Sequence, residues 1–160
     1  MHLRAFLLTL HVFSAIAAFG ASFAFPFIGQ LAQKEGAPVA WFLRLMHLIE
    51  SKWLLPFALT VQPGTGAGLI IISKGSWDPF DWSKPHSGLW LFIALIIYTI
   101  AIAFSVLVQV PRVKKALTMA EANQFGPEFG ALMKKGAMGG QFLTVMLTAI
   151  IILMVVKPGA

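Results

Sequence analysis

The chain has 160 residues, of which 58% are hydrophobic and only 11% are charged, and its net charge is +6. Its mean hydropathy of +0.82 lies well outside the range of soluble domains, so the composition indicates an integral membrane protein. The absence of cysteine excludes disulfides and thiolate metal ligands.

Four apolar stretches are long enough to cross a hydrocarbon core of ~30 Å, which takes about 20 helical residues. They lack the period-two alternation of barrel strands, so they predict helices. The connections are too short for a soluble domain. We therefore expect a single membrane domain with an all-α fold, a four-transmembrane-helix bundle. The predicted spans cover about residues 3–31, 39–73, 88–110 and 141–156.

Within the first span, the run FLLTLHVFSAIAAFGASFAF, residues 6–25, holds one ionisable side chain, His11. The start of the chain is similar to a secretory signal, but the apolar run continues to about residue 31, so we expect a retained span. A rise of ~1.5 Å per residue places His11 ~9 Å outward of the bilayer midplane. An imidazole at that depth needs a partner and is a candidate functional group.

A stripe of small side chains follows His11 on the same helix face, namely Ser14, Ala15, Ala18 and Ser22. Such a stripe permits close packing of two helices, and it equally permits a flat macrocycle to lie against the helix. The imidazole has corresponding alternatives: a local hydrogen bond, or axial ligation of a cofactor. The candidate cofactor-binding residues are His11, Ser14, Ala18, Tyr98 and Met154.

The second span begins with a polar group formed by Arg44, His47 and Glu50, at helical spacings of three. We interpret it as a secondary polar site, either a hydrogen-bonded group at the head groups or a site for a proton or a metal. His47 lies ~24 Å from His11 along the membrane normal, so the two cannot share one iron. Further on, Pro63 and the glycines after it predict a break in the helix, near the level of His11.

Between the second and third spans, residues 73–90 contain three tryptophans, which favour a loop lying along the membrane surface. After the third span, residues 111–140 are basic and amphipathic, and they predict a connector in the interface. In this connector Gly126 and Pro127 break one helix, and a second short helix ends at Gly139 and Gly140.

The distribution of Lys and Arg predicts the orientation. Eight of the twelve lie on the side of residues 111–140, and positive-inside bias places that side in the cytoplasm, with both termini outside. The positive charge is expected to contact anionic lipid head groups of the bilayer. It gives no reason to expect a nucleic-acid partner.

Several short motifs carry a family resemblance: LHVFSAIAAFGASF, the arginine of WFLRLMH, PFALTVQPGTGAGL, and WLFIALIIYTIAIAF followed by a basic helix. Together they resemble the small four-helix membrane proteins of the DUF2269 type, and more distantly the membrane domain of CopD-like copper proteins. The resemblance implies a multi-pass protein of the bacterial inner membrane. It matches His11, Gly20, Arg44 and the Pro63–Gly66 segment, and it implies no established activity.

Three functions remain open at this stage. The first is binding of haem b or a metal in membrane electron transfer, with His11 as one ligand and Met154, His86 or the His11 of a second chain as the other. The second is copper handling, with His2, His86 and His11 as a path inward. The third is a non-catalytic subunit of a larger membrane complex or a homo-oligomer, with no cofactor. Hydrolytic catalysis is not expected, because no nucleophile has an adjacent base.

Overall fold

The computed structural model describes residues 2–73, 78–80 and 88–158. Within these ranges the chain is helical and has no strand. The first long helix is α1 (His2–Lys34) and the last is α6 (Pro127–Val156). The second is made of α2 (Val39–Ile49), the π-helical turns η1 (Glu50–Leu54) and η2 (Phe57–Val61), and α3 (Gln62–Ile72). The third is made of α4 (Leu89–Phe104), the π-helical turn η3 (Ser105–Gln109) and α5 (Val110–Glu121).

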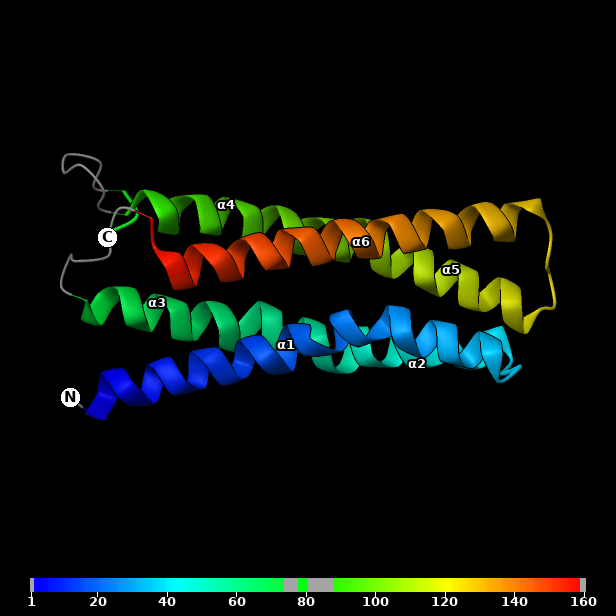
Figure 1. The fold of residues 1–160 in the computed structure, drawn as a ribbon, viewed down its shortest axis with the longest axis horizontal. Coiled ribbons are helices and arrows are strands. Elements are labelled where there is room, and N and C mark those ends of the chain that lie inside the picture. The colour runs from blue at the N-terminus through cyan, green and yellow to red at the C-terminus, as the bar shows by residue number, and fades with distance from the viewer. Residues whose placement is uncertain (1, 74–77, 81–87, 159–160) are drawn as a thin grey trace.

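The four long helices run along one axis, and both termini lie at the same end of the bundle (Figure 1). All four are long and apolar enough to cross a membrane. This confirms the predicted all-α fold with four membrane-spanning helices. Each long helix has 30 to 34 residues, or ~45 to 51 Å, which exceeds the ~30 Å hydrocarbon core. The first, third and fourth helices therefore extend beyond the predicted spans, and the limits of the spans stay predictions.

The bundle consists of two helical hairpins. In the first, α1 packs along η2 and α3, and in the second, α4 packs along α6. At the end opposite the termini, α2 and α5 join the hairpins through a core of four buried residues, Leu43, Val113, Ala116 and Ala120. The connections at this end, residues 35–38 and 122–126, are short.

The predicted break at Pro63 is wrong, because the second long helix continues through this residue. Pro56, Pro63 and Pro111 each lie two residues after the last residue of a π-helical turn. Before Pro63, for example, the Gln62 amide donates to the carbonyl of Phe57, five residues back instead of four. A π-turn absorbs the irregularity that proline imposes, so these helices bend locally without ending.

The predicted end of a short helix at Gly139 and Gly140 is also wrong, because α6 runs unbroken from Pro127 to Val156. The interruption before Pro127 is present, since α5 ends at Glu121 and Gly126 is the N-cap residue of α6. The helix α5 continues the third long helix directly after η3 and packs along α2 within the bundle. Apolar side chains on one face of α5 make this packing favourable, although its other face is basic.

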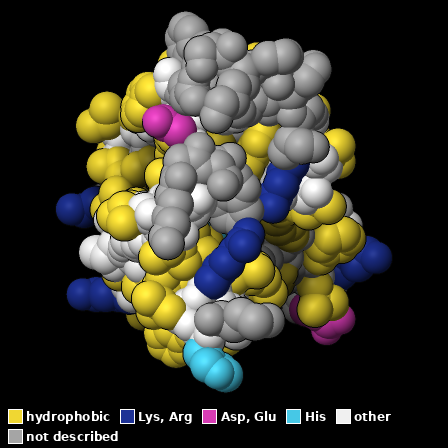
Figure 2. Space-filling view, turned by 90° about the vertical axis from the view of Figure 1, so that its left-hand side faces the viewer, with side chains coloured by type: hydrophobic (Ala, Val, Ile, Leu, Met, Phe, Trp, Pro, Cys, Tyr) yellow, Lys and Arg dark blue, Asp and Glu magenta, His cyan; other side chains and the backbone are white. Residues whose placement is uncertain are grey.

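Figure 2 looks onto the end with the termini, where hydrophobic side chains surround the rim of the bundle. Much of the predicted tryptophan-rich loop, residues 74–77 and 81–87, lies outside the described residues. Trp90 is described, and it is buried in the first turn of α4.

Candidate functional site

His11 is hydrogen-bonded through both ring nitrogens to the second long helix. Its Nδ1 lies 2.9 Å from the Thr65 hydroxyl, and its Nε2 lies 3.2 Å from the amide nitrogen of Gln62. That nitrogen can only donate, so Nε2 accepts and Nδ1 carries the proton. The Thr65 hydroxyl in turn donates to the carbonyl of Val61, at 2.7 Å. These bonds suit a neutral imidazole.

The stripe of small residues beside His11 is covered by the second long helix. Ser14 is fully buried and lies 2.5 Å from the Gln62 amide oxygen, and Ala18 is 1% exposed. A Cβ atom added to Gly66 would lie 3.3 Å from the His11 ring, so the glycine permits the close approach of α3. At Ser14 and Ala18 the stripe is buried by helix packing, the first of its two interpretations, whereas Ser22 at its far end lines the groove described below.

The other predicted cofactor residues take no part in the hydrogen bonds of the His11 ring within the described chain. Tyr98 on α4 donates to the carbonyl of Ala58, and its ring meets Phe19 edge-on at a centroid distance of 6.3 Å. Met154 is half-buried on α6, whose main neighbour is α4, whereas His11 bonds to the second long helix. His86, the proposed outer ligand, lies outside the described residues.

The secondary polar site is only partly assembled. Arg44 pairs with Glu121 at the end of α5, with 2.5 Å between Nη2 and Oε1, in an exposed position. Glu50 is 6% exposed, and its Oε2 atom has no hydrogen-bond partner in the described part of the chain. The same holds for Nδ1 of His47. Three or more His, Asp or Glu side chains grouped for a metal are not found among the described residues.

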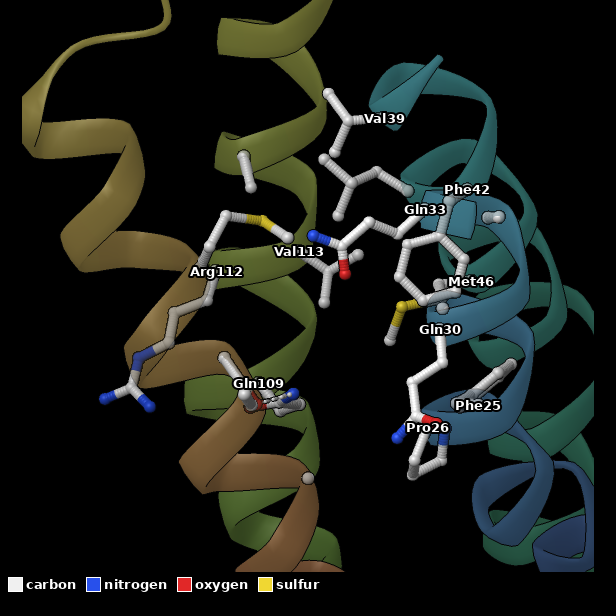
Figure 3. A pocket seen from close by; sticks show the side chains of 18 of the residues that line it. Phe25, Pro26, Gln30, Gln33, Val39, Phe42, Met46, Gln109, Arg112 and Val113 are labelled. Atoms are coloured by element: carbon white, nitrogen blue, oxygen red, sulfur yellow. Dashed lines mark hydrogen bonds between the residues drawn. The ribbon is translucent and has the colours of Figure 1, made fainter. Parts of the chain in front are cut away.

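A groove of about 1080 Å³ lies between the two hairpins, near the end opposite the termini. Its floor is the contact of α2 with α5, and its sides are α1 and α6, which meet each other much less. Figure 3 shows side chains of α1 and α2 facing those of α5 and α6 across it. We call this space the inter-hairpin groove; its lining includes Phe25, Gln30, Gln33, Phe42, Met46, Val113, Met133, Gly136, Gly140, Gln141 and Thr144.

The lining combines apolar side chains with neutral polar ones. The amides of Gln30, Gln33 and Gln141 belong to it, and Figure 3 shows Gln30 and Gln33 projecting from α1 toward the opposite hairpin. Arg112 is the one charged residue in the lining. Its guanidinium lies 5.9 Å from the centre of the Phe104 ring and is turned away from α1 and α2 (Figure 3). The interior of the groove is therefore almost uncharged.

Glycines of α6 leave part of the groove empty. A Cβ atom added to Gly136 or Gly140 would meet no atom within 4 Å. Between them, Gly139 packs against Gln109, whose amide nitrogen donates to the Gly136 carbonyl at 3.0 Å. One face of α6 thus contacts η3 closely while the neighbouring face borders open space.

Sequence reasoning missed the groove. The signal in the sequence was glutamine at the inner ends of the first and fourth predicted spans, together with glycines in residues 136–140. Considered one helix at a time, the glutamines indicate only the end of a membrane span, and the glycines indicate only a helix face without side chains. Their common site appears only once the two hairpins are placed beside each other.

The chain belongs to the DUF2269 family, described as predicted integral membrane proteins, whose family model matches residues 5–158. No curated protein and no solved structure matches the chain. The likeness to CopD-like copper proteins therefore stays a prediction.

Proposed function

We propose that this DUF2269 protein is a membrane-embedded binding protein that holds an amphipathic molecule of the lipid class in the inter-hairpin groove. The observation that carries the proposal is the groove itself, with a volume of about 1080 Å³ and a mixed apolar and amide lining. Sites for small molecules occupy roughly 300 to 1,000 Å³, and they combine apolar walls with a few polar groups.

The length of the groove supports an elongated ligand. Its lining on α6 runs from Leu132 to Val145, which corresponds to ~20 Å along the helix. One leaflet of the hydrocarbon core is ~15 Å thick. The groove thus suits a molecule that lies parallel to the lipid chains, with its polar part toward the loops at residues 35–38 and 122–126.

The groove supports this function better than the contacts of His11 support haem b or metal binding in electron transfer. Axial ligation would require one ring nitrogen to give up Thr65 or Gln62, and the face of Ser14 and Ala18 is already packed. Copper handling relies on the same imidazole. Both hypotheses stay predictions, and absorbance spectra and metal analysis of the purified protein test them directly.

The test of the proposal fills the groove without disturbing the fold. Gly136→Leu and Gly140→Leu place side chains in open space, and leucine forms helix better than glycine by ~0.8 kcal/mol. Gly130→Leu is the matched control, because its Cβ position is equally open but outside the groove lining. The proteins are purified in mild detergent, and the retained small molecules are extracted and identified by mass spectrometry.

We expect wild type and Gly130→Leu to retain the same amphiphile in near-stoichiometric amount, and the two groove variants to lose most of it. Equal retention by all four proteins would refute the proposal. The proposal would also be refuted if the wild-type protein retained no amphiphile and instead copurified with a second membrane protein in stoichiometric amount, and if Gly136→Leu abolished that association. That result would support the alternative of an accessory subunit in a larger complex.

A further inference from the structure

We infer that the ligand of the inter-hairpin groove is an isoprenoid quinone, a neutral ring with two carbonyl acceptors and a long apolar tail, held by the amides of Gln30, Gln33 and Gln141. This inference rests on the proposed function and names its ligand class. It starts from the hydrogen-bonding needs of these three side chains.

The three amides lack partners within the described chain. Gln30, Gln33 and Gln141 line the groove with exposed side chains, and no side-chain hydrogen bond joins them to another described residue. Gln30 and Gln141 fall at the inner limits of the first and fourth predicted spans, close to hydrocarbon. A glutamine amide that borders hydrocarbon is unfavourable unless a hydrogen-bonding partner replaces the water it loses. The groove therefore favours a ligand that supplies hydrogen-bonding atoms.

The charge of the lining selects a neutral ligand. It holds no carboxylate and no imidazole, and its one cation, Arg112, is turned toward Phe104 and away from the opposite hairpin. A phosphate or carboxylate head group placed in the groove would be buried without a facing cation, which is costly in apolar surroundings. Carbonyl oxygens, in contrast, need only the N–H donors that glutamine amides provide.

The apolar lining favours a flat ring over a flexible glycerol head group. Phe42 and Phe25 project from the first hairpin, and methionine sulfurs line the space from both sides, at Met46 and Met133. Aromatic rings pack on one another in offset or edge-on arrangements, and methionine sulfur makes favourable contacts with ring edges. Beyond the ring, the open space beside Gly136 and Gly140 continues toward Thr144 and accommodates an isoprenoid tail.

The test uses the full chain in nanodiscs of phosphatidylcholine. A short-chain isoprenoid benzoquinone is added, and the bound fraction is measured by extraction and ultraviolet absorbance against empty nanodiscs. Phosphatidylglycerol and diacylglycerol are added in parallel as an anionic and a neutral competitor. Gln33→Leu and Gln141→Leu remove one amide each, and Gln124→Leu, in the loop outside the lining, is the control.

We expect saturable binding of about one quinone per chain, and roughly tenfold weaker binding for each groove variant, because each loses one hydrogen bond to the ligand. Gln124→Leu should bind as wild type does. Displacement of the quinone by phosphatidylglycerol, or binding unchanged in both groove variants, would overturn the inference. If no quinone binds while Gly136→Leu still removes a copurifying amphiphile, the proposed function survives and only the quinone assignment fails.

Discussion

The contacts of His11 allow its contribution to stability to be worked out. His11→Ala removes two hydrogen bonds between α1 and the second long helix, to Thr65 and to Gln62. Such interhelical bonds in membrane proteins average ~0.6 kcal/mol each, with a maximum near ~1.7. The substitution also removes the ring that packs against Gly66. We therefore expect a loss of ~1 to 2 kcal/mol in the free energy of unfolding.

The assay is reversible unfolding in mixed micelles, monitored by circular dichroism, with His2→Ala as control on the same helix. His2 is exposed, so its substitution should change the free energy of unfolding by less than ~0.5 kcal/mol. A double-mutant cycle with Gln62→Leu should show a coupling energy near ~0.6 kcal/mol. Absorbance spectra of the same samples provide the second readout.

Two results would refute this reasoning about His11. A coupling energy near zero between positions 11 and 62 would mean that the hydrogen bond between their side chains does not form. A haem absorbance band or stoichiometric copper or iron in wild type, lost in His11→Ala and kept in His47→Ala, would make His11 a ligand. In that case the hydrogen-bonded cluster would be a state without the cofactor.

Three further predictions concern other positions. Gly139→Ala places a methyl group against the amide oxygen of Gln109. We therefore expect the free energy of unfolding to fall by ~1 to 3 kcal/mol in the same assay. An unchanged free energy of unfolding would contradict the packing of η3 on α6. Gly88 has a φ of +79°, and a Cβ atom added to it would clash with the carbonyl oxygen of Asp78. Gly88→Ala should therefore lower the thermal midpoint of unfolding more than Ala94→Gly does. An unchanged midpoint would exclude the backbone turn at Gly88. A reporter active only in the cytoplasm should be active when inserted near Gln124 and silent after Ala160, and the reverse pattern would overturn the charge-based orientation.

Much of the fold was predictable because bilayer thickness sets helix length. Composition and apolar run length predicted an all-α bundle with four membrane-spanning helices, and the structure confirms it. The interruptions were harder, because a proline in a sequence signals a lost N–H donor but does not say how the backbone replaces it. At Pro63 a π-turn keeps the helix continuous, so the predicted break is wrong.

The site was less predictable, since its residues meet only through tertiary packing. The stripe after His11 indicated that another helix packs on this face, but it did not indicate which helix. In the structure Gln62 and Thr65 of the second long helix bond to the His11 ring. The available signal was two polar residues three positions apart in an otherwise apolar span, at the level of the histidine in the first span. The inter-hairpin groove depends on the spacing between α1 and α6, which no pattern within one helix encodes.

The His11 cluster and the inter-hairpin groove share no residues, and this leads to a last prediction. None of the residues in the His11 cluster lines the inter-hairpin groove, and none of the groove amides bonds to the cluster within the described chain. Effects of substitutions that share no partners usually add within ~0.3 to 0.5 kcal/mol. We expect His11→Ala to lower stability and leave ligand retention unchanged, and Gly136→Leu to abolish retention and leave stability equal or higher. Loss of retention in folded His11→Ala would show that the α1–α3 contact controls the groove, and the assignment of separate roles would then be wrong.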